Sequence, residues 1–467
     1  MQISHRSGTI SRQAEWRVCV IVSSGATAQT GSFLNFAPFL ARLLLALLLT
    51  PSVAVQAQEF RYLTITNGMV VTHSDADGVV TFRAIANDSE NVSILKYTGN
   101  GGDVTVPSTI NGRPVTSIGQ RAFSGKAPLT SVKMPASVAY IGAEAFSYCN
   151  DLTNVTFGNG TIRIGTAAFD SCSNLVNVAL PSHVTSIGTR AFHSCRSLSK
   201  VTIPRSVTNI GTEAFSRCIN LTNTTIPDSV TSIAQSMFTY CSRLANVTLP
   251  TNLARIGVKA FAHCESLSGI TIPGSVTDIG YEAFAHCSNL TSVTMLEGVT
   301  SIPVHAFNWC LRLTNATIPI SVTNIDGGAF DGCANLIAVT LPNRLANIGN
   351  YAFSGCRRLN KIRIPDHVTQ IGGLAFAGCS SLTAVLIPGA VTRIGASAFA
   401  NCTSLRAIYF QGDAPILDAR VFNYDNLAIV YYLPGRTGWG PTFDARPAVE
   451  QDPRSQRGEP DFDLRPD

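Results

Sequence analysis

The sequence predicts a solenoid, a single array of about 13 similar coils of 23 residues with different segments at its two ends. Two observations predict it. Twelve cysteines recur at a constant interval of 23 residues, and a phenylalanine lies three residues before each of them. Phe123 fits the same period one interval earlier, with Lys126 in the place of the cysteine. A fixed period of this length is typical of repeat proteins, in which every copy forms one supersecondary unit.

Residues 1–57 are expected to form an export signal with an unusually long segment before its apolar core. The core begins at Leu43 and is uncharged, Arg42 lies just before it, and Val55-Gln-Ala57 has the small residues that precede a cleavage site. The apolar run is too short for a membrane-spanning helix, and a buried helix is the alternative interpretation. We therefore expect cleavage after Ala57, export of the mature chain and no transmembrane anchor in it.

Residues 58–103 are predicted to form a β-rich N-terminal cap. The segment from Phe60 to Gly102 is polar and strand-like, with turn signals at Asn67-Gly68 and Asp77-Gly78. The terminal units of a repeat array must differ from the middle ones because they have a neighbour on one side only.

One coil can be followed from residue 267 to residue 289. Its opening Leu-x-x-Ile-x-Ile alternates apolar and polar residues, which predicts a short strand. Pro273 ends this strand because proline cannot donate a hydrogen bond to a strand ladder. Residues 276–279 predict a second short extended segment, and a glycine then permits a turn. A compact helical or 3₁₀ turn is expected to begin at Ala283-Phe284 and to lead to Cys287.

A single unit of 23 residues cannot bury its own apolar side chains. Stacked copies place Leu on Leu, Ile on Ile and Phe on Phe, so that stability comes mainly from contacts between neighbours. Coils joined by strand ladders lie about 4.8 Å apart, so about a dozen coils are expected to give a rod or arc on the order of 60 Å long.

The repeated unit Leu-x-x-Val-x-Ile-Pro-x-x-Val-x-x-Ile-Gly-x-x-Ala-Phe-x-x-Cys resembles the BspA-like class of leucine-rich repeats. The resemblance covers residues 104–410, without an insertion. It implies a leucine-rich-repeat solenoid of the α/β horseshoe class that is rich in β-strand, right-handed, and lined by strands on its concave face. It also implies a bacterial surface or secreted protein, often an adhesin that binds host or matrix components, although one repeat scaffold can serve many partners.

Residues 411–445 are predicted to form a C-terminal cap. Tyr409-Phe410-Gln-Gly interrupts the repeat, Leu427 to Tyr432 predicts a closing strand, and Pro434 to Gly440 predicts a turn around a packed tryptophan. Without a cap, the last strand edges would be free to pair with other chains. The composition becomes charged and poor in apolar residues from Arg446, so residues 446–467 are predicted to form a disordered tail.

The twelve periodic cysteines are predicted to form a structural ladder of reduced, buried thiols. An exported protein can form disulfides, which are the alternative. Parallel stacking, however, keeps equivalent Cβ atoms about 4.8 Å apart, beyond the usual window of about 3.5–4.5 Å for a disulfide. No two of them have the close spacing of a zinc site, and a buried cysteine behaves as a small hydrophobe. The members are Cys149, Cys172, Cys195, Cys218, Cys241, Cys264, Cys287, Cys310, Cys333, Cys356, Cys379 and Cys402.

The residue before each cysteine changes from coil to coil and includes Gly, Arg and Trp, which a buried column would not accept interchangeably. This column is expected to face solvent while the cysteine faces the core, so His286 and Cys287 point apart and do not form a nucleophile and its base. Tyr240, His263, His286 and Trp309 occupy the column in four consecutive coils, which predicts a stripe of rings roughly 15 Å long. Such a stripe can stack on sugars or anchor a protein partner, and chance at a tolerant position is the alternative.

Seven threonines form a second exposed column, at a strand position of consecutive coils. Similar arrays occur in ice-binding solenoids, but the flanking residues Asn223, Asn246, Gly269 and Ser292 are mixed, whereas an ice-binding surface needs a second regular column. Strand propensity and contacts between stacked threonines explain the column without a ligand. The members are Thr202, Thr225, Thr248, Thr271, Thr294, Thr317 and Thr340.

Composition and motifs exclude several functions. The net charge is only +5, and no run of Lys and Arg of the kind that binds nucleic acid occurs. We find no P-loop, His-Glu-x-x-His or Gly-x-Ser-x-Gly motif, so we expect no enzyme, no catalytic residue, no metal and no cofactor. The sequence predicts a secreted or cell-surface protein that uses the repeat surface for recognition of, or adhesion to, a protein or a glycan. A structural or spacer component of the cell surface is the alternative, and ice binding through the threonine column is a remote one.

Overall fold

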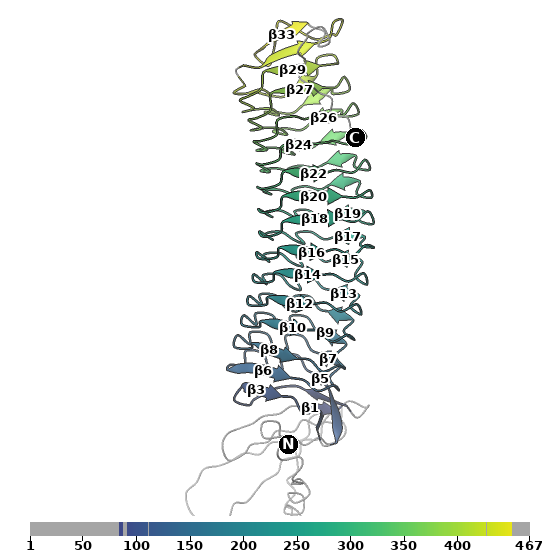
Figure 1. The fold of residues 1–467 in the computed structure, drawn as a ribbon, viewed down its shortest axis with the longest axis vertical. Coiled ribbons are helices and arrows are strands. Elements are labelled where there is room, and N and C mark those ends of the chain that lie inside the picture. The colour runs from purple at the N-terminus through teal and green to yellow at the C-terminus, as the bar shows by residue number, and fades with distance from the viewer. Residues whose placement is uncertain (1–83, 87–90, 111, 426, 451–467) are drawn as a thin grey trace, which may run out of the picture. The chain divides into compact units, whose positions relative to one another are not determined.

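The computed structural model describes residues 84–86, 91–110, 112–425 and 427–450 (Figure 1). The chain divides into two compact units, one ending at Arg196 and the other beginning at Ser197, and each is described by itself. The predicted export signal, most of the predicted N-terminal cap and the predicted tail beyond residue 450 lie outside the described residues.

In unit 1, each coil contributes two short strands that join two parallel sheets. One sheet contains β3 (Gly102–Thr105), β6 (Leu129–Lys133), β8 (Asn154–Thr156) and β10 (Asn177–Ala179). The other contains β2 (Val92–Ile94), β5 (Arg113–Ile118), β7 (Tyr140–Ile141), β9 (Arg163–Ile164) and β11 (Ser186–Ile187). At the N-terminal end, β1 (Ala84–Ala86) pairs antiparallel with β2, and β4 (Thr109–Ile110) pairs antiparallel with β5.

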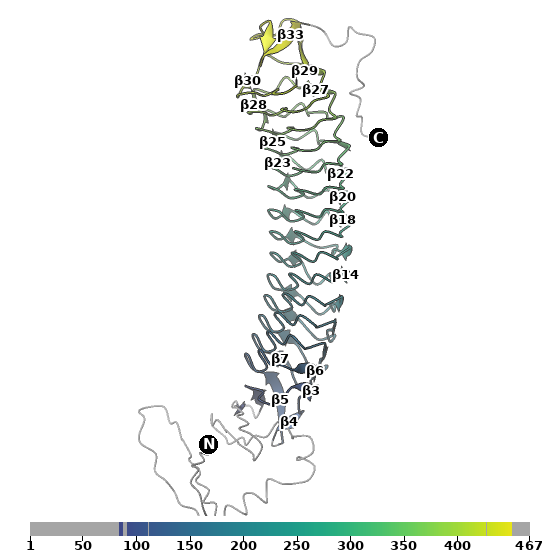
Figure 2. The ribbon, with the colours of Figure 1, turned by 90° about the vertical axis from the view of Figure 1, so that its left-hand side faces the viewer.

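Unit 2 is built from the same kind of two-stranded coil, with its first strands along one side and its second strands along the opposite side (Figure 2). The first strands are β12 (Lys200–Thr202), β14 (Asn223–Thr225), β16 (Asn246–Thr248), β18 (Gly269–Ile272), β20 (Ser292–Met295), β22 (Asn315–Thr317), β24 (Ala338–Val339), β27 (Ala384–Ile387), β29 (Ala407–Phe410) and β31 (Ile429–Tyr432). The second strands are β13 (Asn209–Ile210), β15 (Ser232–Ile233), β17 (Arg255–Ile256), β19 (Asp278–Ile279), β21 (Ser301–Ile302), β23 (Asn324–Ile325), β25 (Asn347–Ile348), β26 (Gln370–Ile371), β28 (Arg393–Ile394) and β30 (Ile416–Leu417).

Strand register follows the sequence period. Asn223 pairs with Asn246, and Thr225 with Thr248, each 23 residues apart. Between β24 and β27, the segment that contains Lys361 and Arg363 pairs with Ala338 and Leu386 through isolated bridges. The second strand of the same coil, β26, forms regular ladders with β25 and β28. The predicted solenoid of leucine-rich repeats is therefore confirmed.

A column of stacked rings forms the centre of each unit. Ring centroids of neighbouring members are 4.7–5.3 Å apart in unit 1 and 5.2–5.7 Å apart in unit 2. Tyr97 extends the column of unit 1 and Phe422 extends the column of unit 2 beyond the predicted thirteen phenylalanines, so the chain forms about 15 turns. The members are Tyr97, Phe123, Phe146, Phe169 and Phe192 in unit 1, and Phe215, Phe238, Phe261, Phe284, Phe307, Phe330, Phe353, Phe376, Phe399 and Phe422 in unit 2.

The predicted compact helical or 3₁₀ turn at Ala283-Phe284 is wrong, and the described residues contain no helix. Glu282 and His286 have φ of 53° and 60°, in the left-handed region, which interrupts any right-handed helical run. The backbone amides instead alternate between hydrogen-bond acceptors in their own coil and acceptors in the next coil. Cys287 N–H bonds Phe284 within the coil, whereas Phe284 N–H bonds the Ala306 carbonyl of the next coil at 2.9 Å. Hydrogen bonds between coils thus satisfy the backbone that a helix would have satisfied internally.

The C-terminal cap ends later than predicted. Strand β33 (Arg446–Glu450) pairs parallel with β31 and antiparallel with β32 (Thr442–Phe443). The prediction of disorder from Arg446 is therefore wrong for residues 446–450, which form a strand between β31 and β32. The predicted packed tryptophan is confirmed, because Trp439 stacks on Tyr432 with centroids 4.8 Å apart and donates from Nε1 to the Gly412 carbonyl at 3.3 Å.

Candidate functional site

The predicted stripe of rings lies on the turn that precedes each cysteine. Tyr240, His263, His286 and Trp309 have φ between 57° and 61°, in the left-handed region. This conformation turns the side chain away from the core while the following cysteine points inward. Tyr240 is 43% exposed and Trp309 is 49% exposed, the two histidines are half-buried, and Cys287 is fully buried.

The structure brings all four side chains together in one stack. Tyr240 and His263 have ring centroids 4.3 Å apart with planes 10° apart, and His263 and His286 have centroids 4.4 Å apart with planes 5° apart. His286 and Trp309 follow at 6.5 Å and 8°. Parallel, offset rings at these distances attract one another beyond the effect of simple burial.

Arg217 extends the stack by one coil, a contact that sequence reasoning missed. Its guanidinium carbon lies 5.2 Å from the centroid of the Tyr240 ring, which is a cation–π contact. The sequence does contain a signal for this contact, because Arg217 directly precedes Cys218 just as His263 directly precedes Cys264.

Burial favours the uncharged imidazole inside the stack. The pKa of His263 is lowered mainly by burial and then by the neighbouring His286, while Glu265 and Glu282 oppose this shift. His263 is therefore held neutral at neutral pH, so that two stacked imidazoles do not repel each other.

The cysteine ladder is separate from the stack and faces inward. All twelve cysteines are buried, free thiols in the structure. The Cys287 thiol donates to the Phe261 carbonyl of the preceding coil at 3.3 Å, and ten other cysteines repeat this contact at 3.1–3.3 Å. Burial raises the pKa of both Cys241 and Cys287 to about 12, which disfavours the thiolate that a nucleophile or a zinc ligand requires.

The threonine column lies on the first strands. Its members are exposed except Thr294, which is half-buried, and Thr271, Thr294 and Thr317 pair in register. The flanking column is irregular, since Gly269 pairs with Ser292. The threonine column is therefore a regular face of the first strands that presents one hydroxyl group per coil.

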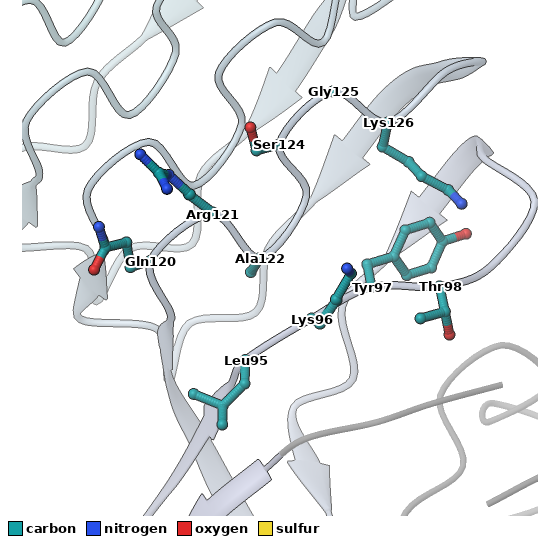
Figure 3. A pocket seen from close by; sticks show the side chains of 10 residues that line it. All are labelled: Leu95, Lys96, Tyr97, Thr98, Gln120, Arg121, Ala122, Ser124, Gly125 and Lys126. Atoms are coloured by element: carbon teal, nitrogen blue, oxygen red, sulfur yellow. The ribbon is translucent and has the colours of Figure 1, made fainter. Parts of the chain in front are cut away.

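A cavity that the sequence did not predict lies at the N-terminal end of the described part of unit 1 (Figure 3). It has a volume of about 630 Å³ and is lined by Lys96, Tyr97 and Lys126 among others. The Lys126 ammonium lies 5.6 Å from the centroid of the Tyr97 ring. Arg121, also in the lining, forms an ion pair with Glu144 at 2.7 Å. Its lysines give the cavity a positive charge.

Two further features concern membranes and metals. Among the residues that the structure describes, no helix has the length and apolarity needed to cross a bilayer. Within the same residues, no cluster of three or more His, Cys, Asp and Glu side chains is arranged to hold a metal ion.

The two-stranded coils, the phenylalanine column and the inward cysteines define a leucine-rich-repeat protein. The family described as "BspA type Leucine rich repeat region (6 copies)" matches residues 102–222, 208–337 and 300–429, which is more than half of the chain. The chain therefore belongs to this family. Proteins with this type of repeat are bacterial surface or secreted proteins, and the family is generally a non-enzymatic scaffold whose repeats typically mediate protein binding.

Two solved structures of leucine-rich repeat proteins are similar to this chain. A leucine-rich repeat protein from Bacteroides ovatus ATCC 8483 is 28% identical, with a TM-score of 0.67, over 80% of this chain and 100% of that chain. A leucine rich cell surface protein from Faecalibacterium prausnitzii A2-165 is 34% identical, with a TM-score of 0.47, over 73% of this chain and 95% of that chain. No curated protein matches the sequence.

Proposed function

We propose that this chain is a secreted or cell-surface binding protein that recognises a protein or a glycan on its exposed repeat surface, in adhesion and without catalysis. The family supports a binding scaffold, and the export signal predicted in residues 1–57 supports the location. The small net charge of +5 gives no support for nucleic acid as a partner.

The stack from Arg217 to Trp309 is the observation that carries this proposal. A residue with a Cβ atom in the left-handed conformation costs roughly 1–2 kcal/mol. Gly332, Gly355 and Gly378 occupy the same position in later coils, which shows that the coil folds without a ring there. The rings therefore exceed what the fold requires, and exposed aromatic and arginine side chains are typical of binding hot spots.

The chemistry of the neighbouring groups supports a non-catalytic role. The raised pKa of Cys287 and the lowered pKa of His263 leave a neutral thiol and a neutral imidazole. The Cys287 thiol donates to a carbonyl of the preceding coil rather than to His286. This arrangement does not activate a nucleophile.

A binding screen tests the proposal. The full mature chain is applied to panels of glycans and of extracellular-matrix proteins, with the double variant Tyr240→Ala/Trp309→Ala beside it. We expect the wild type to bind at least one member and the double variant to lose that binding. The matched control is Tyr148→Ala, which removes an exposed ring at the same coil position in unit 1. Equal binding by the double variant and the wild type would exclude the stack as the site.

The uniform threonine column favours a second candidate, a structural or spacer component of the cell surface. A spacer needs length and regularity but no ligand, and the in-register pairs Thr271–Thr294 and Thr294–Thr317 supply regularity. The absence of any ligand in the screen, together with ordered self-association of the purified chain, would favour the spacer. Ice binding, the remote candidate, requires thermal hysteresis or inhibition of ice recrystallisation, and the lack of both would dispose of it.

A further inference from the structure

We infer that one face of the Trp309 indole is a stacking site for a sugar ring, which makes a glycan the ligand of the stack. This inference rests on the proposed binding function and specifies the class of ligand within it. It follows from which ring faces the stack covers and which it leaves open.

The first three rings have both faces covered. Tyr240 lies between Arg217 and His263, His263 lies between Tyr240 and His286, and His286 lies between His263 and Trp309. A ligand can therefore touch only the edges of these three rings. Stacking requires a ring face, and the residue that follows Trp309 in this column is Gly332, which has no side chain to cover the second face of the indole.

The second face of Trp309 is turned toward Gly332. A Cβ atom at position 332 would lie 3.1 Å from Cδ2, 3.3 Å from Cγ and 3.4 Å from Cε2 of the indole, directly above the ring. Glycine has no such atom, and Gly355 and Gly378 continue the column in the next two coils without side chains. The indole consequently extends past the glycine backbone, and about half of Trp309 is exposed at 49%.

Polar groups border this face. The Trp309 backbone amide donates to the Asp331 carbonyl at 2.7 Å, which holds the Asp331 backbone next to that of Trp309. The Asp331 carboxylate is half-buried and accepts from the Asn308 side-chain amide at 3.1 Å. The Ser354 side chain and the Gly332 backbone amide also hydrogen-bond this carboxylate. A carboxylate offers about four acceptor positions, so Asp331 retains about one for a ligand hydroxyl. Among the described residues, none accepts a hydrogen bond from the indole Nε1–H, which leaves one donor for the ligand.

The shape of the site favours a sugar over a peptide side chain. A protein hot spot requires a well-packed pocket from which water is fully excluded. Trp309 offers a single flat face with glycine backbone beside it. A pyranose needs only one apolar face, since its carbon–hydrogen bonds lie against the negative face of the aromatic ring. Its hydroxyls lie at the rim, where water can continue to bind them.

Two substitutions test the open face in opposite ways. Trp309→Ala removes it, and Gly332→Tyr covers it with another ring. The backbone conformation is compatible with a tyrosine, because Tyr240 has φ of 61° where Gly332 has 74°. The new Cβ atom would lie 3.1 Å from Cδ2 of the indole, so the indole shifts slightly as the added ring covers its face. Gly355→Ala is the matched control, since it introduces a Cβ atom at the same left-handed position without reaching Trp309. Thermal unfolding of each variant confirms that it folds.

The probes are neutral hexasaccharides of β-linked glucose, N-acetylglucosamine, mannose and galactose, applied to the full mature chain and followed by calorimetry and by saturation-transfer NMR. For the sugar that binds, we expect Trp309→Ala and Gly332→Tyr each to weaken affinity at least about ten-fold, and Gly355→Ala to leave it unchanged.

Two results would overturn the inference and leave the proposed function standing. One is glycan binding that neither Trp309→Ala nor Gly332→Tyr weakens, and the other is binding of a matrix protein with no glycan bound. Binding of neither class would instead defeat the proposed function itself, and the inference with it.

Discussion

Replacing Asp425 with cysteine should stabilise the C-terminal end of the array at alkaline pH. Asp425 lies 23 residues after Cys402 and therefore occupies the cysteine position of the last coil. It is only 1% exposed, and its carboxylate oxygens form no well-formed hydrogen bond with the described residues. Burial raises its pKa to about 7, partly offset by the Cys402 backbone amide and Arg446.

The magnitude follows from the pKa shift. Each pKa unit corresponds to about 1.4 kcal/mol, so a rise from the ordinary 3.8 to about 7 corresponds to about 4 kcal/mol. The folded state binds the proton more tightly than the unfolded state does. The stabilisation is therefore complete below about pH 4 and is lost as the pH rises through about 7. A cysteine at this position stays neutral at pH 8, as burial raises the pKa of its ladder neighbours.

Hydrogen exchange measures this effect locally, because a repeat array opens at its ends before it unfolds as a whole. The reporters are the amides of Asp425 and Ala428, which bond the carbonyls of Phe422 and Asp425. We expect Asp425→Cys to slow their exchange at pH 8 by up to about three orders of magnitude, after correction for intrinsic rates. At pH 4 the difference should nearly vanish.

Two controls separate charge from packing. Asp425→Asn removes the charge and keeps the shape, so it should reproduce most of the gain at pH 8. Asp366→Asn removes an exposed carboxylate of unit 2 and should change nothing. An effect of Asp425→Cys that is the same at pH 4 and pH 8, or a loss of protection at pH 8, would refute the reasoning.

The remaining predictions concern the core, the thiols and the stack. Phe284→Ala should destabilise unit 2 by about 3–5 kcal/mol in denaturant unfolding, because the cavity lies between two stacked neighbours, while Tyr351→Ala at the surface should cost little. The twelve ladder thiols should resist iodoacetamide at pH 8 until the chain is denatured, and alkylated mass should not depend on reductant; protection that disappears only with reductant would indicate disulfides. Since the pKa of His263 is lowered, its contribution to stability is present above the ordinary value of 6.5 and is lost as the pH falls through the folded-state value. His263→Gln should make thermal stability less dependent on pH between 7 and 5, and an NMR titration of His263 at or above 6.5 would contradict the shift.

The repeating residues allowed most of the fold to be predicted. The equivalents of Phe284 and Cys287 recur every 23 residues from Phe146 to Cys402. A residue that must contact its own copy in the next coil reveals the stacking direction and the register. Tyr97 and Phe422 were not predicted as members of the ring column because the residues around them depart from the repeated unit. Tyr97 lies 26 residues before Phe123, outside the 23-residue period, and Phe422 is followed by Asp425 at the position where twelve earlier coils have a cysteine.

The candidate site was only partly visible in the sequence. The variable column showed that Tyr240, His263, His286 and Trp309 lie in consecutive coils, but side-chain spacing along a column does not define ring orientation. Glu282 and His286 adopt left-handed backbone conformations, which are uncommon for residues other than glycine. Neither could be predicted locally, because hydrogen bonds to the neighbouring coil stabilise them.

The sequence by itself determined the periodic contacts of this protein: which residues face inward, which strands pair, and that each coil needs its neighbours. These contacts recur in successive coils, so the period of the sequence is enough to predict them. Only the tertiary structure decided that the turn is not helical, that β33 extends the cap, and that one face of Trp309 remains uncovered. Each of these depends on the adjacent coil, whose backbone accepts the alternate amides and whose glycine at position 332 leaves the indole face open.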